Sequence, residues 1–101
     1  MEGIKMAEKY NGYTNRETWS ASLQYDDILY EDAMAYIAQD RTFEQFKSHT
    51  ERIIQEDVLR ALREPQIHTL ASELLCASLR AINYEELAVN AWEEAINDTY
   101  A

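Results

Sequence analysis

Residues 83–97, Asn-Tyr-Glu-Glu-Leu-Ala-Val-Asn-Ala-Trp-Glu-Glu-Ala-Ile-Asn, decide the fold class of this chain. Their apolar side chains recur at the i, i+3, i+4, i+7 spacing that forms one face of an α-helix. The members of this series are Tyr84, Leu87, Ala88, Ala91, Trp92, Ala95 and Ile96. Asn83, just ahead of them, has the short polar side chain that favours a helix N-cap. The stretch therefore predicts an amphipathic helix that begins directly after Asn83.

The longest periodic stretch predicts a second helix at about 43–63. Thr42 and Gln45 have the spacing of a capping box, in which two side chains satisfy free backbone N–H groups at a helix start. Pro65 ends this helix, because proline lacks an N–H and its ring clashes with the preceding turn. Since proline is favoured in the first turn of a helix, another helix is expected from about 66.

The N-terminal third predicts a flexible arm at residues 1–10, followed by two short helices. Asn-Gly at 11–12 is typical of a turn. Thr14 and Glu17 repeat the capping-box spacing just before the next apolar positions. The two helices are expected at about 15–26 and about 28–39.

Composition supports one small helical domain. The chain has 101 residues, 47% of them hydrophobic, with only two Gly and one Pro. Sheet proteins need many turns, and turns depend on Gly, Pro, Asn and Asp, so this scarcity favours helices joined by short connections. We expect an all-α fold, a compact bundle of about five helices with short loops, in which residues 11–101 form a single helical domain.

The cysteine content and the hydropathy indicate a reducing, aqueous compartment. Cys76 is the single cysteine, and its apolar neighbours are typical of a buried, reduced thiol. No stretch approaches the roughly 18 apolar residues of a membrane span. The first residues also lack the apolar region of a signal peptide. These features predict a cytoplasmic protein.

Negative charge is unevenly distributed along the chain. Nineteen acidic residues stand against nine Lys and Arg, which gives a net charge of −10. Residues 26–40 and 81–101 each hold five acids and no base, whereas 41–64 holds five of each. A protein of this charge is repelled by nucleic acids and anionic membranes, and its complement is a basic surface. The simpler interpretation is a solvated surface, and the choice depends on whether the two acidic segments are neighbours in space.

The sequence lacks the patterns that mark catalytic or metal sites. His49 and His68 are the two histidines, and no His-x-x-His, His-Glu-x-x-His or Cys-x-x-Cys spacing occurs. There is also no Gly-rich phosphate loop and no Gly-x-Ser-x-Gly motif. We therefore expect no catalytic residue, no metal, no cofactor and no enzymatic activity. A small enzyme that binds metal at scattered acids is the less favoured alternative.

Residues 11–19, Asn-Gly-Tyr-Thr-Asn-Arg-Glu-Thr-Trp, resemble the opening motif of a family of small phage and mobile-element proteins of unknown function. Members begin Asn-Gly-(Trp/Tyr)-Thr-Asn-x-x-Thr-Trp. The runs at 70–75 and 82–88 are similar to the closing pair of helices in that family. Small acidic phage proteins recurrently inhibit host defence, so the resemblance implies an anti-CRISPR or antirestriction protein of the host cytoplasm. It implies no active-site residue.

Charge and resemblance together give one functional hypothesis. The protein would inhibit a host protein or ribonucleoprotein complex by binding its basic groove through acidic helix faces that mimic DNA. It would act as a monomer or homodimer, with no direct contact to nucleic acid or membrane. The alternative is a generic helical protein-interaction module without mimicry. The predicted partner-binding residues are acids and interface-type tyrosines: Asp26, Asp27, Glu31, Asp32, Glu85, Glu86, Glu93, Glu94, Tyr25 and Tyr30.

Overall fold

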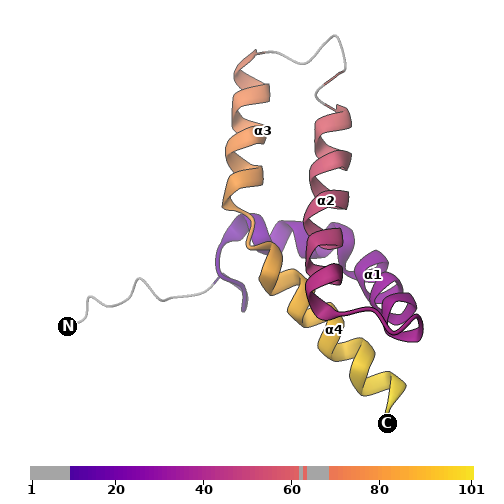
Figure 1. The fold of residues 1–101 in the computed structure, drawn as a ribbon. Helices are drawn as coiled ribbons and strands as arrows, with labels where there is room; N and C mark the ends of the chain where they lie inside the picture. Colours follow the sequence, from indigo (N-terminus) through magenta and orange to yellow (C-terminus); the bar gives the residue numbers. More distant parts are fainter. Residues whose placement is uncertain (1–9, 62, 64–68) are drawn as a thin grey trace, which may run out of the picture.

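Helices form most of the described chain (Figure 1). The computed structural model describes residues 10–61, 63 and 69–101, with the backbone alone for 69–73. In chain order the elements are α1 (Arg16–Ala38), α2 (Phe43–Ala61), α3 (Thr69–Ala81) and α4 (Tyr84–Thr99). The all-α prediction is confirmed for this part of the chain, although the structure has four helices rather than about five. Among the described helices, none is both long enough and apolar enough to cross a membrane.

The difference in helix number arises in α1, which is continuous where the sequence predicted two helices. The predicted break fell at Asp26 or Asp27, and aspartate disfavours a helix by only about 0.7 kcal/mol relative to alanine. Ala21, Leu29 and Ala33 are all buried, so one apolar face continues across the predicted break. Burial of this face outweighs the weak local preference, and no Gly or Pro interrupts the helix.

The turn before α1 follows the sequence, but the cap does not. Asn11 and Gly12 both have positive φ angles, 48° and 89°, as a type I′ turn requires. The predicted Asn-Gly turn is therefore confirmed. The capping box predicted from Thr14 and Glu17 is wrong, because Asn15 is the N-cap and its side chain accepts from the Thr18 N–H. A short amide side chain at the N-cap reaches that N–H directly.

The other helix ends agree with the sequence where they are described. Thr42 and Gln45 form the predicted capping box, with the Thr42 N–H donating to Gln45 Oε1 at 2.9 Å and the Gln45 N–H donating to Thr42 Oγ1 at 3.1 Å. The N-cap at Asn83 is also confirmed. Pro65, the helix start expected at 66 and the arm at residues 1–9 lie outside the described residues.

The core lies where α4 packs against α1 and α2. Leu29 from α1, Phe46 from α2 and Leu87 from α4 are completely buried. The Trp92 ring packs at a tilt against the Phe46 ring, with 5.4 Å between the ring centroids, and this contact joins α4 to α2. Cys76 on α3, predicted to be buried, is only half-buried, because α3 makes few contacts with the other helices. The contact between α1 and α4 is the most extensive in the fold, and it positions the candidate site.

Candidate functional site

The packing of α1 on α4 brings the two acidic segments together. Tyr30 on α1 donates its hydroxyl proton to Asp98 Oδ2 on α4, with an O–O distance of 2.5 Å. Met34 lies one turn beyond Tyr30 on α1, and its Sδ atom is 3.4 Å from the hydroxyl oxygen of Thr99 on α4. The second half of α1 therefore runs along the second half of α4. Residues 26–40 and 81–101, which sequence alone could not place, are neighbours in space.

Carboxylates from both helices gather along this contact. The pKa of Asp26 is raised from its ordinary value by partial burial and then by the negative charges of Glu94 and Asp27. Asp26, Asp27, Glu94 and Asp98 together are called the acidic face below. Glu31 is exposed one turn beyond Asp27 and extends the same row on α1. The acidic face therefore combines carboxylates of α1 and α4 that are more than sixty residues apart in the sequence.

The two tyrosines predicted as contact residues have structural roles within the molecule. Tyr25 donates its hydroxyl proton to Asp57 Oδ2 on α2, at 2.5 Å. Burial raises the pKa of Tyr25 to about 12, and the hydrogen bond to Asp57 adds to this effect. The hydrogen bond to Asp98 likewise raises the pKa of Tyr30. Tyr25 therefore links α1 to α2, and Tyr30 links α1 to α4.

The remaining predicted acids fall into two groups. Asp32 lies 2.7 Å from His49 Nε2 and joins α1 to α2, while Glu86 accepts a hydrogen bond from the Thr14 N–H at 3.0 Å. Both carboxylates therefore have internal partners. Glu85 and Glu93 are exposed on α4. Glu93 borders a shallow hollow with Phe43 and Trp92, so it faces α2 rather than α1.

The motif at 11–19 has a role that the sequence did not reveal. Asn15 Nδ2 donates to the carbonyl oxygen of Ala81 at 2.7 Å, while Asn15 Oδ1 accepts from the Thr18 hydroxyl at 2.6 Å. The Thr18 hydroxyl oxygen in turn accepts from the Asn83 N–H at 2.8 Å. The N-cap of α1 is thus bonded to the residues that connect α3 to α4.

A second set of bonds completes this junction. Asn83 Nδ2 donates to Thr14 Oγ1 at 3.1 Å, and Asn83 Oδ1 accepts from the Glu86 N–H at 3.0 Å. Thr14, Asn15, Thr18, Asn83 and Glu86 together are called the cap clasp. It joins the N-terminus of α1 to the N-terminus of α4, and so fixes how the helices of the acidic face begin. A signal was present, since both segments of the family resemblance contain N-cap residues.

The described residues hold no cluster of three or more His, Cys, Asp or Glu side chains arranged to bind a metal ion. The carboxylates of the acidic face, presented by two packed helices, can attract a basic surface over distances of about the Debye length, roughly 8 Å at physiological ionic strength.

Comparison with known proteins places the chain in a family without assigning it a function. No curated protein and no solved structure matches it. One family model, described as a family of unknown function, matches residues 6–100. That match includes both segments of the cap clasp and both helices of the acidic face. The chain therefore belongs to the DUF7249 family, a family of unknown function.

Proposed function

We propose that this protein is a non-enzymatic inhibitor that binds a basic, nucleic-acid-binding surface of another protein through its acidic face. The observation that carries the proposal is the contact of α1 with α4, which joins two base-free segments into one surface. Those segments account for the whole net charge of −10. Five of the ten acids in these segments lie on this surface: Asp26, Asp27, Glu31, Glu94 and Asp98.

The spacing of the carboxylates supports DNA mimicry. Asp27 with Glu31 on α1, and Glu94 with Asp98 on α4, are pairs four residues apart on a helix. Such pairs place their side chains about 6 Å apart. Successive phosphates on one DNA strand are separated by roughly 7 Å, in line with the charge density of the duplex. Two packed helices thus offer two rows of negative charge, as the two strands of DNA do.

The more specific proposal concerns the target. The resemblance to small phage and mobile-element proteins favours a host-defence complex, of the CRISPR or restriction type, as the partner with the basic groove. In that complex the acidic face would occupy the path of the nucleic acid. Exposed Leu23 and Ile28 on α1 could add apolar contacts beside the charges, since their side chains are 66% and 50% accessible.

Two charge-reversed variants test the proposal. The face variant carries Asp27→Lys, Glu31→Lys and Glu94→Lys, and the control carries Glu44→Lys, Glu51→Lys and Glu56→Lys on α2. All six positions are exposed, and both variants change the net charge by the same amount. Glu86 and Asp32 are avoided because their internal bonds would confound folding with binding.

The assay is affinity capture from a host lysate treated with nuclease. We expect the wild type and the control to retain a nucleic-acid-binding protein that moderate salt releases, and the face variant to lose it. Equal capture by the face variant would refute binding through the acidic face. Capture that resists salt would favour the alternative, a helical module that binds through apolar surface.

A further inference from the structure

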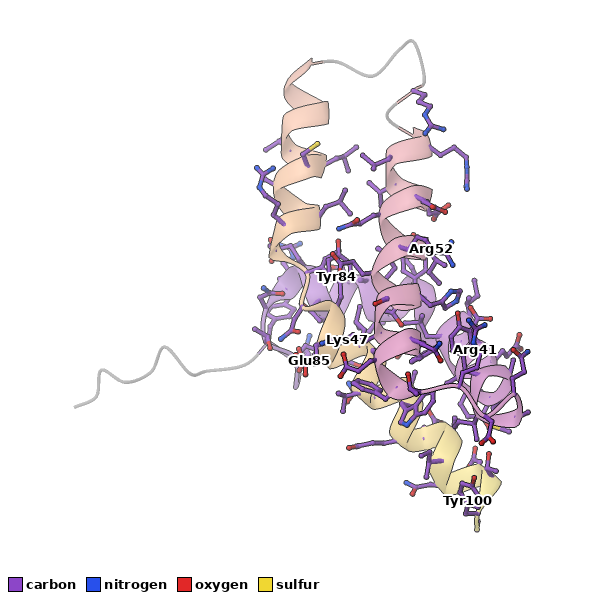
Figure 2. All side chains as sticks on the ribbon, viewed as in Figure 1. Arg41, Lys47, Arg52, Tyr84, Glu85 and Tyr100 are labelled. Atoms are coloured by element: carbon purple, nitrogen blue, oxygen red, sulfur yellow. The ribbon has the colours of Figure 1, made fainter. Side chains whose placement is uncertain are left out.

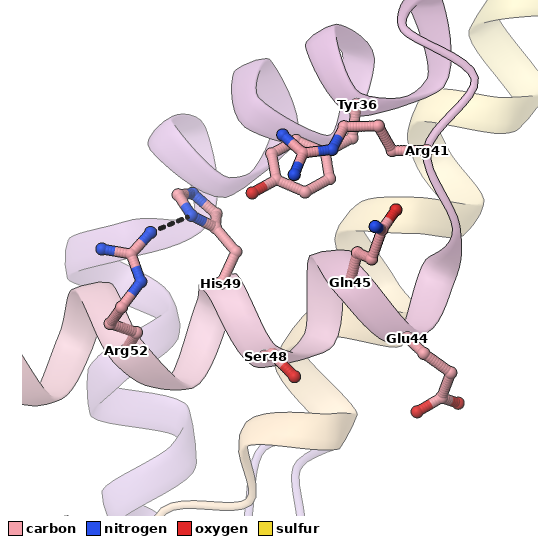
Figure 3. Close-up of a pocket in the computed structure, with 7 residues that line it drawn as sticks. All are labelled: Tyr36, Arg41, Glu44, Gln45, Ser48, His49 and Arg52. Atoms are coloured by element: carbon pink, nitrogen blue, oxygen red, sulfur yellow. Dashed lines mark hydrogen bonds between the residues drawn. The ribbon is translucent and has the colours of Figure 1, made fainter.

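A shallow hollow beside the first half of α2 has the opposite chemistry to the acidic face (Figure 3). It has a volume of about 520 Å³, and six of its lining residues are Tyr36, Arg41, Gln45, Ser48, His49 and Arg52. Figure 2 shows Arg41 and Arg52 on the same side of α2. Two guanidinium groups therefore border a single hollow in a protein of net charge −10.

The backbone between α1 and α2 holds the first of these groups in place. The Asp40 N–H donates to the Ile37 carbonyl at 3.0 Å, and the Arg41 N–H donates to the Tyr36 carbonyl at 2.9 Å. This pair of bonds is a Schellman motif, and Asp40 adopts the left-handed conformation it needs, with φ of 63°. The motif returns the chain over the last turn of α1 and places Arg41 above Tyr36.

The Arg41 guanidinium stacks on the Tyr36 ring, with its central carbon 4.5 Å from the ring centroid. A stacked guanidinium is held flat, while the N–H groups at its edge stay available for a ligand. Arg41 forms no ion pair with any described residue. The charge of Arg41 therefore borders the hollow and is not paired with a carboxylate of the described residues.

The second guanidinium is held through His49. The His49 ring lies 5.1 Å from the Tyr36 ring, and its Nε2 atom is bonded to Asp32 at 2.7 Å. Arg52 Nη2 lies 3.0 Å from the other ring nitrogen, Nδ1. Arg52 also lies 3.5 Å from Glu56, a long contact between exposed groups that leaves several of its five N–H donors free.

Neutral donors complete the lining. Gln45 uses its Oε1 atom to accept from the Thr42 N–H, so its amide NH₂ group remains available. Ser48 also borders the hollow, and Figure 3 shows its hydroxyl pointing away from the Arg41 and Arg52 guanidinium groups. Glu44, which also borders the hollow, lies 3.5 Å from the Lys47 ammonium.

We propose that this hollow binds the phosphate group of a small molecule. A planar guanidinium matches two oxygens of a phosphate, and Arg41 and Arg52 supply two such groups with the Gln45 amide as a further donor. The net charge of −10 opposes a polyanion, which favours a phosphate monoester or free phosphate over a nucleic acid. This site lies apart from the acidic face, so the proposal of phosphate binding does not depend on the proposed function.

Titration with inorganic phosphate, followed by ¹H–¹⁵N correlation NMR at constant ionic strength, tests the proposal. We expect saturable shifts of the Arg41 and Arg52 side-chain N–H signals. Arg41→Gln should weaken phosphate binding about tenfold or more, as loss of a charged hydrogen-bond donor does. Arg60→Gln is the matched control, because Arg60 is an exposed α2 arginine that pairs with Asp57 at 3.0 Å, outside the hollow.

Three results would overturn the proposal. Shifts that fail to saturate, or that chloride reproduces, would mean general screening by salt. An equal loss in Arg60→Gln would mean that phosphate responds to net charge and not to the hollow. Tighter binding of a short oligothymidylate than of phosphate would assign the site to nucleic acid. Arg41→Lys keeps the charge but loses the planar guanidinium, so its phosphate affinity should lie between those of wild type and Arg41→Gln. This intermediate affinity would show that the loss in Arg41→Gln does not come from a folding defect.

Discussion

Replacement of Thr18 by valine should destabilise the fold more than the small change in side-chain structure suggests. Thr18 is fully buried, and its hydroxyl is the centre of the cap clasp. It donates to Asn15 Oδ1 at 2.6 Å and accepts from the Asn83 N–H at 2.8 Å. Valine has the same shape, so Thr18→Val opens no cavity and removes only these two bonds.

The magnitude follows from what each bond leaves behind. The Asn83 N–H, which is partly buried, loses its acceptor. An unpaired buried donor costs about 1–3 kcal/mol, and the lost bond to Asn15 adds about 1 kcal/mol. Asn15 Oδ1 keeps its bond to the Thr18 N–H, which limits the second loss. We expect the free energy of unfolding to fall by about 2–3 kcal/mol. For a chain of this length that lowers the melting temperature by roughly 10–20 °C.

Urea denaturation followed by far-UV circular dichroism measures the change. Thr50→Val is the matched control, because Thr50 is also fully buried but its hydroxyl bonds only to the Phe46 carbonyl, at 3.1 Å. Such a bond to the preceding turn adds little to helix stability, so the control should lose under about 1 kcal/mol. Equal losses in the two variants would refute the clasp, since they would show that any buried hydroxyl has the same effect.

Three further substitutions test local features. Asp26→Asn should raise stability near neutral pH by a few tenths of a kcal/mol, as relief of like charge does. The raised pKa of Asp26 favours its protonated form in the fold. Asp26 therefore contributes to stability below its ordinary pKa of 3.8, and this contribution is lost as pH rises through the raised pKa. A stability gain of Asp26→Asn over wild type that persists below pH 3.8 would contradict this. The pKa of Tyr25, raised from 10.0 to about 12 by burial and by the bond to Asp57, makes wild-type stability fall across that window. Tyr25→Phe should flatten this fall in alkaline denaturation, and an unchanged slope would count against a raised pKa of Tyr25. Asp40→Gly should raise stability by about 0.5–1 kcal/mol because glycine accepts a φ of 63° freely, whereas Asp40→Ala should lower it; thermal melts that reverse this order would exclude the Schellman geometry.

Local patterns in the sequence predicted what local interactions determine. The apolar face and N-cap of α4, the capping box of α2 and the Asn-Gly turn all appear as expected, because each depends on residues within one or two turns. The continuity of α1 was missed because burial of Leu29 and Ala33 against other helices overrides the weak preference of Asp27.

The candidate site depended on contacts that no periodicity specifies. The distribution of charge identified the two acidic segments, but only the packing of α1 on α4 placed them together. The roles of Tyr25 and Tyr30 were missed because their partners, Asp57 and Asp98, are 32 and 68 residues away. The cap clasp was missed for the same reason, since Thr18 and Asn83 each look like an ordinary residue at a helix start.

We propose that the acidic face occupies a surface where another protein binds nucleic acid. The most direct measurement is competition between this protein and duplex DNA for the partner captured from lysate, with the partner held at fixed concentration and salt. We expect DNA and the wild-type protein to exclude each other from the partner. The variant with lysine at Asp27, Glu31 and Glu94 should no longer compete with DNA. A ternary complex of partner, DNA and wild-type protein would contradict the proposal.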